Sequence, residues 1–373
     1  MTPPAAHAQG DTRPAPNECV CANAVQVLRP PGAAQAVRLL AALPHARVIG
    51  GGTDLVPLAR DGLAVLGPLV SVRDMGLAGI ALHDRRLVIG AGATLAEVLQ
   101  SPLVQREAPA VVQALQASAS PQVRNAATVG GNLLQRTRCP YFRGSAPACN
   151  RRLAGSGCAA REGEQRHAAL FGTSEHCVAA HASDLAVALL ALDADVTITG
   201  ALGERRIALE ALYPATATPE REHTLAAGEL ITSIVLDTGP AARASGYLKV
   251  RDRASFQFAL VSLAHAMDRA DGVLRRVRLA VGGMGARPWR LRDSEAVLEG
   301  RDDSPAAWRQ AAAVAGQGAL PLPGNAFKLD LLERCVAHVG DPAAPPGPGC
   351  DRHASECDQE LRTLPFGATG ETA

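Results

Sequence analysis

Four cysteines are the residues of this chain best suited to chemistry, and they fall within 39 positions: Cys139, Cys149, Cys158 and Cys177. Their spacing, C-x9-C-x8-C-x18-C, differs from the paired knuckles of zinc modules and from the tight C-x2-C runs of ferredoxins. Four thiolates on one loop-rich segment can still bind either zinc or an iron–sulfur cluster. The spacing therefore predicts a metal site and leaves the metal open.

The residues around these cysteines favour a charged redox cluster. A Gly-Ser-Gly turn precedes Cys158 and would let backbone N–H groups approach cluster sulfurs. Guanidinium groups could offset the net negative charge of a four-thiolate cluster, and five are close in sequence: Arg136, Arg138, Arg143, Arg151 and Arg152. The alternative is four unpaired structural cysteines among solvated arginines.

Two glycine-rich segments suggest a bound phosphate. The first follows an apolar strand and reads Gly50-Gly51-Gly52-Thr53-Asp54, in which glycines would bring backbone N–H groups close to an anionic oxygen. The second covers Thr128 to Asn132 and is expected to be a loop. Two such loops can grip opposite ends of one extended cofactor, so together they predict a cofactor site better than either does alone.

A third glycine segment, Gly90-Ala91-Gly92, begins like a dinucleotide fingerprint. The third glycine of that motif is absent, with Leu95 in its place, and no acidic residue ends a second strand about twenty positions later. A strand-to-helix turn in a scaffold is the better interpretation than a nicotinamide site.

Polar residues after the last of the four cysteines leave two roles open. Ser183 and Asp184 stand at the expected start of a helix, where Asp184 could cap exposed N–H groups or reach a ribityl hydroxyl. A histidine in a loop is more often a hydrogen-bonding surface residue than a metal ligand, and we expect that role for His181.

Length, charge and composition limit the class of protein. The chain has 373 residues, enough for two or three domains, and a net charge of +1 with basic residues spread throughout. That balance favours a protein or small-molecule partner over nucleic acid or a membrane surface. No apolar run approaches eighteen residues, and we expect no export signal in the N-terminal sequence. Nine cysteines that cluster do not resemble a disulfide framework.

Alternating and helical patterns predict the elements that would position these residues. Strands are expected around residues 24–30, 46–49, 69–75 and 86–90, and helices over 32–43, 93–100, 108–119 and the segment after Asp184. From about Gly246 the chain changes to strands followed by amphipathic helices, which suggests a separate α+β domain.

These observations predict four regions. Residues 1–22, rich in Pro and Ala, should form a flexible arm, and residues 341–373 a disordered tail. Residues 23–239 should form the cofactor-binding domain, in two subdomains, with the cysteine segment inserted at about 136–178. Residues 240–340 should form the C-terminal α+β domain.

With these pieces in place the chain resembles the FAD-binding subunits of molybdenum hydroxylases, the group that contains xanthine dehydrogenase, aldehyde oxidoreductases and carbon monoxide dehydrogenase. The matching segments are IGGGTDLVPLAR, IGAGATLAEV, ATVGGNLLQ, SDLAVALLAL, GYLKVR, GGMGARPWR and NAFKLDLLER. The resemblance covers about residues 24 to 340. It implies an α+β protein with an FAD-binding fold of the vanillyl-alcohol oxidase or p-cresol methylhydroxylase type, followed by a C-terminal α+β domain of the CO dehydrogenase flavoprotein type.

The resemblance also implies which residues bind FAD. The segment from Val48 to Leu55 would wrap the pyrophosphate, and the segment from Thr128 to Asn132 would form the other loop. Asp184 would hydrogen-bond the polar chain of the flavin. Ile231 and Lys249 would approach the isoalloxazine ring. The full set is Val48, Ile49, Gly50, Gly51, Gly52, Thr53, Asp54, Leu55, Thr128, Val129, Gly130, Gly131, Asn132, Asp184, Ile231 and Lys249. Leu58-Ala59-Arg60 departs from the usual LMK or LMR ending of the first segment.

More narrowly, CPYFRG, ACNRR and GSGCAA resemble an insertion in the flavin subunit of bacterial periplasmic aldehyde oxidoreductase. That likeness implies a [4Fe-4S] cluster on the four cysteines and a heterotrimer with a molybdenum-cofactor large subunit and a [2Fe-2S] small subunit. An aldehyde would be oxidised at molybdenum, and FAD here would collect the electrons for an external acceptor. It also implies the periplasm, by export with a signal-bearing partner. A stand-alone FAD-linked oxidase and a zinc-stabilised scaffold without enzymatic activity are the alternatives.

Overall fold

The computed structural model describes residues 25–215, 219 and 221–341. The predicted N-terminal arm, residues 1–22, lies outside the described residues, as does the predicted tail after Asp341. The same holds for the four cysteines of the terminal segments, which are Cys19, Cys21, Cys350 and Cys357.

A small parallel sheet begins the fold. Its strand order is β1-β3-β2, with β1 at Val27–Leu28, β2 at Arg47–Ile49 and β3 at Leu69–Ser71. Helix α1, Ala33–Ala42, buries Ala36 and Val37 and packs on the sheet through a small apolar core. The helix ends before Pro44, as predicted, because the residue before a proline disfavours helical backbone. Helix α2, Leu55–Arg60, follows β2 directly.

A five-stranded antiparallel sheet forms the second layer, in the order β4-β5-β8-β6-β7. Its strands are β4 Ile80–His83, β5 Arg86–Gly90, β6 Asp195–Gly200, β7 Gly203–Ala208 and β8 Leu230–Asp237. The helices of this part are α3 Leu95–Gln100, α4 Pro102–Glu107, α5 Pro109–Gln116, α6 Pro121–Ala126, α7 Val129–Leu133 and α9 Asp184–Ala191, with a 3-10 turn at Leu209–Leu212. Every residue of α9 is buried, which suits a helix that is apolar all round.

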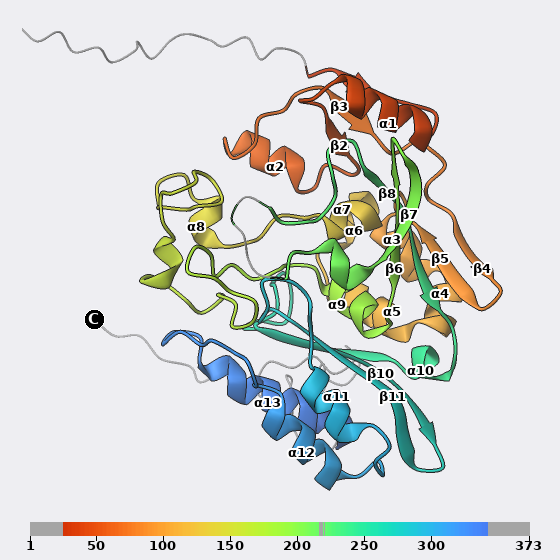
Figure 1. Cartoon of the computed structure of the whole chain (residues 1–373), viewed down its shortest axis with the longest axis vertical. Coiled ribbons are helices and arrows are strands. Elements are labelled where there is room, and N and C mark those ends of the chain that lie inside the picture. Colours follow the sequence, from red (N-terminus) through yellow and green to blue (C-terminus); the bar gives the residue numbers. More distant parts are fainter. Residues whose placement is uncertain (1–24, 216–218, 220, 342–373) are drawn as a thin grey trace, which may run out of the picture.

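The C-terminal part is a four-stranded antiparallel sheet, β12-β11-β10-β9, covered by three helices (Figure 1). The strands are β9 Gly246–Val250, β10 Val261–Ala270, β11 Val273–Gly282 and β12 Trp289–Arg290, preceded by the short helix α10, Pro240–Arg243. The helices are α11 Arg292–Leu298, α12 Pro305–Val314 and α13 Phe327–Gly340. The sequence predicted α11 and α13 in outline but not α12.

Alternation along β10 explains how this sheet holds the two parts together. Leu263 and Met267 belong to the core beneath α11, α12 and α13, whereas Ala264 and Ala266 belong to the core around α9. Successive side chains of a strand point to opposite faces of the sheet. Small alanines on one face let α9 approach the sheet closely, and large side chains fill the other face.

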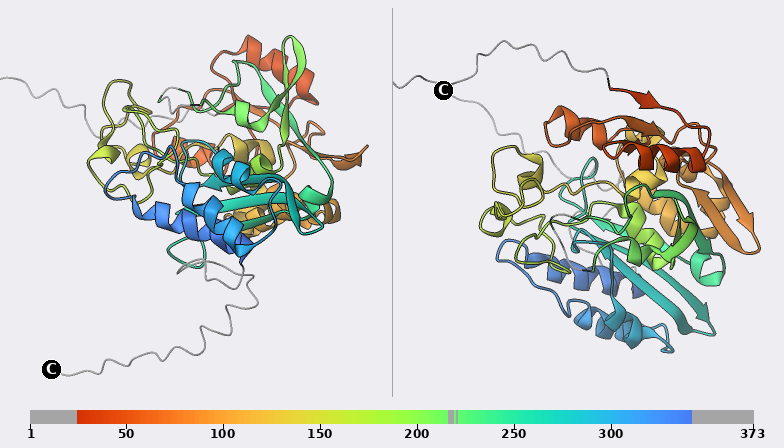
Figure 2. Two further views of the ribbon diagram at one scale, coloured as in Figure 1. Left: turned by 60° about the horizontal axis from the view of Figure 1, so that its bottom comes forward. Right: turned by 45° about the horizontal axis from the view of Figure 1, so that its top comes forward.

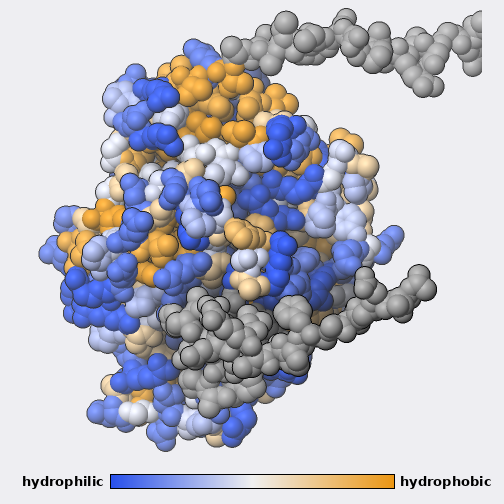
Figure 3. Space-filling model, turned by 180° about the vertical axis from the view of Figure 1, so that it is seen from behind, coloured by the Kyte–Doolittle hydropathy of each residue, from blue (hydrophilic) through white to orange (hydrophobic). Residues whose placement is uncertain are grey.

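The cysteine segment forms a loop-rich lobe with only two short helical turns, α8 at Pro140–Arg143 and a 3-10 turn at Ala159–Arg161. Figures 1 and 2 place this lobe at the opposite end of the molecule from the β4–β5 hairpin. On the back of the molecule, apolar residues gather at the end that carries the N-terminal sheet (Figure 3). None of the described helices is both long and apolar enough to cross a membrane.

One local prediction is wrong. The segment from Thr128 to Asn132 was expected to be a loop, but residues Val129–Leu133 form the one-turn helix α7. Thr128 caps this helix, since its side chain accepts a hydrogen bond from the N–H of Gly131 at 3.2 Å. Two adjacent glycines disfavour helix in isolation, but the cap and the packing of the neighbouring elements outweigh that preference here.

Candidate functional site

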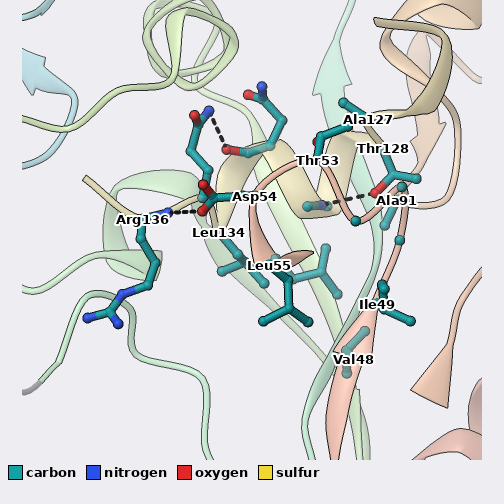
Figure 4. A pocket seen from close by; sticks show the side chains of 18 of the residues that line it. Val48, Ile49, Thr53, Asp54, Leu55, Ala91, Ala127, Thr128, Leu134 and Arg136 are labelled. Carbon is teal, nitrogen blue, oxygen red and sulfur yellow. Dashed lines mark hydrogen bonds between the residues drawn. The ribbon is translucent and has the colours of Figure 1, made fainter. Parts of the chain in front are cut away.

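A cavity of about 940 Å³ lies where the first sheet, helix α7 and the loop after β9 meet. Its volume is near the upper end of the range of about 300–1,000 Å³ that is usual for ligand sites. Residues far apart in the sequence line it, among them Gly51, Thr128, Asp184, Ile231 and Lys249. Figure 4 shows the wall on which the first glycine turn meets the segment around Thr128.

The first glycine turn offers hydrogen-bond donors to this cavity. The chain leaves β2 at Ile49, turns through Gly52 in the left-handed region with φ of 71°, and enters α2 at Leu55. No backbone hydrogen bond among the described residues uses the N–H groups of Gly51, Gly52, Thr53 or Asp54. A turn with free N–H groups is suited to an anionic oxygen such as that of a phosphate.

The second glycine segment, Thr128 to Asn132, does not offer the backbone donors expected of a phosphate-binding loop. The N–H groups of Val129 and Gly130 donate to the carbonyls of Ala93 and Ala91, at 2.9 and 2.8 Å. These donors already have partners and are not free for a ligand. The segment instead forms a wall of the cavity and a support for the first turn.

The two glycine segments lie against each other, so they cannot grip opposite ends of a cofactor. A Cβ atom at Gly50 would lie 2.4 Å from Oγ1 of Thr128, and one at Gly51 would lie 1.7 Å from the carbonyl oxygen of Ala126. A larger residue has no room at either position, because the Thr128 side chain packs on Gly50 and the backbone of Ala126 and Ala127 packs on Gly51. We infer that the shape of the first turn depends on the second segment.

Asp54 joins the first glycine turn to the cysteine lobe. Its carboxylate accepts hydrogen bonds from the backbone N–H of Arg136 and from the guanidinium of Arg143, each at 2.8 Å, and Arg138 forms an ion pair with it at 2.8 Å. The Asp54 side chain is 16% exposed. The Asp54 carboxylate therefore binds the cysteine lobe, and the backbone N–H groups of the turn are the groups available to a ligand.

Asp184 lies at the wall of the cavity within a buried polar network. Its Oδ2 atom accepts from Nζ of Lys249 at 2.8 Å, and its Oδ1 atom accepts from the hydroxyl of Tyr247 at 2.5 Å. Burial and the neighbouring carboxylate raise the pKa of Tyr247 well above its ordinary value. The helix cap is not Asp184 but Ser183, whose Oγ atom accepts from the N–H of Ala186 at 3.0 Å.

The Lys249–Asp184 pair predicts a large loss of stability for one substitution. In Lys249→Met the carboxylate of Asp184 would stay buried without its cation, and breaking a buried pair costs about 3–5 kcal/mol. The expected result is a lower midpoint of urea unfolding. Arg334→Met is the control, because it removes an ion pair with Asp330 that is more than half exposed and worth at most about 1 kcal/mol. Equal midpoints for the two variants would contradict the prediction.

Of the predicted cofactor residues, all except Val129 line this one cavity. Val129 is 1% exposed and belongs to the core around α9. The sequence did not single out several further lining residues, which come from three distant segments: Ser118, Glu222, His223, Phe256 and Phe258. The two phenylalanines are unusual in a chain with so few aromatic residues, and their exposure, 66% and 44%, was the signal that only a structure could supply.

The four cysteines of the lobe converge on a second, smaller cavity. Cys139, Cys149, Cys158 and Cys177 all line it, and none of the four forms a disulfide. Cys149 and Cys158 pair as an isolated antiparallel bridge. Burial raises the pKa of the Cys139 and Cys158 thiols. A bound metal would reverse that preference, because a coordinating thiol is deprotonated.

The five arginines near these cysteines bind carboxylates, backbone carbonyls and one sulfur, and two carboxylates are each shared by two arginines. Arg151 donates from Nε to the sulfur of Cys177 at 3.1 Å. Arg136 and Arg143 reach carboxylates, those of Glu222 and Asp54. Arg152 donates to backbone carbonyls, and Arg138 pairs with Asp54 and lies over a phenylalanine ring. The observed hydrogen bond to a cysteine sulfur thus comes from Arg151.

His181 is not the surface residue expected from its place in a loop. Its ring lies edge-on to Tyr213 with centroids 4.7 Å apart, and its Nδ1 atom accepts from the N–H of Ser183 at 3.3 Å. Burial lowers the pKa of His181 to about 4, so the ring is neutral at neutral pH. The ring is not part of the lining of the large cavity.

Comparison with known proteins identifies the family. Residues 23–237 match the family described as the FAD binding domain in molybdopterin dehydrogenase, and residues 246–328 match the CO dehydrogenase flavoprotein C-terminal domain. The chain belongs to the FAD-binding subunits of the molybdenum hydroxylase family. Its cofactor is accordingly FAD.

Individual relatives agree with this family. The chain is 42% identical to the aldehyde oxidoreductase FAD-binding subunit PaoB of Escherichia coli K12 over 80% of this chain and 91% of that protein. It is 26% identical to the nicotine 6-hydroxylase medium subunit of Paenarthrobacter nicotinovorans over 85% of this chain and 98% of that one.

Solved structures confirm the predicted fold of this FAD-binding subunit. Carbon monoxide dehydrogenase of Hydrogenophaga pseudoflava matches with a TM-score of 0.66 at 21% identity, over 84% of this chain and 95% of that one. Quinoline 2-oxidoreductase of Pseudomonas putida 86 gives the same TM-score and identity over 86% and 97%.

Proposed function

We propose that this chain is the FAD-binding electron-transfer subunit of a molybdenum-dependent aldehyde oxidoreductase. FAD supplies a centre that takes up two electrons and releases them to an acceptor. The observation that carries the proposal is the large cavity, which gathers fifteen of the sixteen residues that the family resemblance assigns to FAD. The specific reaction is taken from PaoB, whose name describes a subunit of an aldehyde oxidoreductase.

The residues of the cavity have distinct roles toward FAD. The free N–H groups from Gly51 to Asp54 would bind the pyrophosphate, because they are donors without partners on a glycine turn. Lys249 and Asp184 would shape the wall, and their mutual ion pair keeps both charges satisfied. Oriented donors and fixed charges are what a protein contributes to a bound flavin, so no side chain of this chain need act as a nucleophile.

We further propose that the four cysteines bind a [4Fe-4S] cluster, a one-electron redox centre. Support comes from the donor set: four free thiols line one cavity beside a buried guanidinium. Zinc is bound as a single ion with Zn–S bonds of about 2.3 Å, whereas a four-iron cluster is bound by one cysteine at each iron and is wider. The contents of zinc, iron and acid-labile sulfide therefore distinguish the two.

The partners in this proposal are a molybdenum-cofactor large subunit and a [2Fe-2S] small subunit. The names of the relatives support an assembly, since PaoB and the nicotine 6-hydroxylase medium subunit are each described as one subunit of an enzyme. The external electron acceptor stays open. A periplasmic location, through export with a signal-bearing partner, remains a proposal that fractionation of the native host would test.

Composition of the purified protein tests this function. We expect bound FAD and about four irons with four acid-labile sulfides per chain, beyond those of the partner clusters, and copurification of both partners from the native host. The visible spectrum, iron, sulfide, zinc and FAD should be measured on one anaerobic sample. Stoichiometric zinc without sulfide in this chain would refute the cluster, and aldehyde turnover by the chain alone would refute the partner model.

A further inference from the structure

Arg151 occupies a special place between the two cavities. Its side chain is only 6% exposed, and its Nε atom donates to the sulfur of Cys177 at 3.1 Å. It lines the small cavity of the cysteines. A guanidinium that is charged, buried and bonded to a ligand sulfur acts at short range with little screening by solvent.

Glu222 continues this contact toward the large cavity. Its Oε1 atom accepts from Arg151 at 2.7 Å, and its Oε2 atom accepts from Arg136 at 2.8 Å. Glu222 is 20% exposed, and both Glu222 and Arg136 line the large cavity. One carboxylate thus bridges a cation at the cysteines and a cation at the FAD cavity.

A second contact joins the cysteine cavity to the large cavity. The guanidinium of Arg136 lies over the ring of Phe142, 4.4 Å from its centroid. Phe142 is 1% exposed and lines the cysteine cavity. The backbone N–H of Arg136 is bound by Asp54 in the first glycine turn. Arg136 is therefore held by both sites, and a change at either one reaches it directly.

We propose that Arg151 and Glu222 form a charge pair that sets the reduction potential of the cluster from outside its ligand set, Arg151 raising the potential and Glu222 lowering it. The proposal rests on the [4Fe-4S] cluster proposed above. One-electron reduction adds a negative charge to the cluster. A cation and an N–H donor at the Cys177 sulfur stabilise that charge, and a carboxylate behind the cation opposes it.

The two residues are positioning residues, since they act on the cluster through Cys177 and through the electric field. Because the two residues carry opposite charges, the signs of the two potential shifts distinguish a field effect from a general loosening of the lobe. General loosening of the lobe would alter the potential in one direction whichever residue was changed. A field effect requires that removal of the cation and removal of the anion shift the potential in opposite directions.

The test is a redox titration of the purified complex with dithionite and mediators, followed by the electron paramagnetic resonance signal of the reduced [4Fe-4S] cluster. Arg151→Met should shift the potential to a more negative value, and Glu222→Gln should shift it to a more positive one. Arg161→Met is the matched control, because Arg161 lies in the same lobe, is exposed, and its guanidinium donates to the carbonyl of Ser174 and not to a described carboxylate or sulfur. The reduction potential of the cluster in the Arg161→Met complex should equal that of the wild type.

Iron content separates the outcomes. A wild-type complex without the additional four irons would refute the proposed cluster and this inference with it, whereas a complex that contains them tests the inference alone. If Arg151→Met loses its iron, Glu222→Gln decides, because it preserves the shape of the side chain: a more positive potential supports the inference, and an unchanged or more negative one overturns it. Shifts of the same sign in Arg151→Met and Glu222→Gln would also overturn it.

Discussion

Replacing Gly51 with alanine is expected to abolish FAD binding. The added methyl group would lie 1.7 Å from the carbonyl oxygen of Ala126 and 2.9 Å from the amide nitrogen of Ala127. Both are backbone atoms, which cannot rotate away as a side chain can. The glycine turn would have to move off its support and carry its free N–H groups with it. Overpacking of this kind costs about 1–3 kcal/mol in stability, and the loss of donors from the pyrophosphate site adds to it for FAD.

The measurement is the ratio of FAD to protein after purification, together with the melting temperature. Gly51 has no positive φ, so any effect of Gly51→Ala is steric and not a backbone preference for glycine. Gly79→Ala is the control, since a Cβ atom there meets nothing within 4 Å and its φ is likewise not positive. An FAD ratio in Gly51→Ala equal to that of Gly79→Ala would remove the first turn from the FAD site.

The sequence predicted those parts of the fold that a local pattern specifies. A helix was predicted after Asp184, and α9 forms there, buried at every position. Strands were predicted after Gly246, and β10 forms there, with its leucine and alanines divided between two cores. The helix at Val129 was missed because a threonine cap and hydrogen bonds to Ala91 and Ala93 stabilise it. The two adjacent glycines in the sequence do not predict these interactions.

The candidate site was predictable as a set of residues but not as a set of contacts. The glycine turn, Asp184 and Lys249 were expected at FAD from resemblance, and all of them line one cavity. Their partners depend on residues far away in sequence. Asp184 is bound by Tyr247 and Lys249, more than sixty positions later, and Asp54 is bound by Arg143, 89 positions later. No periodicity or spacing encodes such pairs.

The role of Glu222 was even harder to predict from the sequence, because it depends entirely on contacts with distant residues. Glu222 lies outside the described helices and strands, eight residues before β8. Only the fold brings it to Arg136 and Arg151, which are 86 and 71 positions away. The sequence did predict that arginines would accompany the cysteines. It could not tell which of the five would reach a sulfur.

Replacing Cys149 with serine is expected to remove the iron of this chain. Cys149 lines the small cavity, and its backbone is bridged to Cys158, so a serine would be held in the same place. Its hydroxyl is a harder and far less acidic donor than a thiol and a poor ligand for iron of an iron–sulfur cluster. The iron specific to this chain should fall to near zero. Most FAD should remain, because Cys149 is not among the residues that line the FAD cavity.

The matched control is Cys335→Ala, which changes a cysteine of α13 that is fully buried in the C-terminal core. This variant loses some packing and should be less stable, yet it should keep all of its iron. Iron, sulfide and FAD are counted on both proteins purified side by side. If Cys149→Ser keeps its iron, Cys149 is not a ligand. If both variants lose iron alike, the loss reflects weakened folding, and only a selective loss in Cys149→Ser assigns the cluster to the four cysteines that share one cavity.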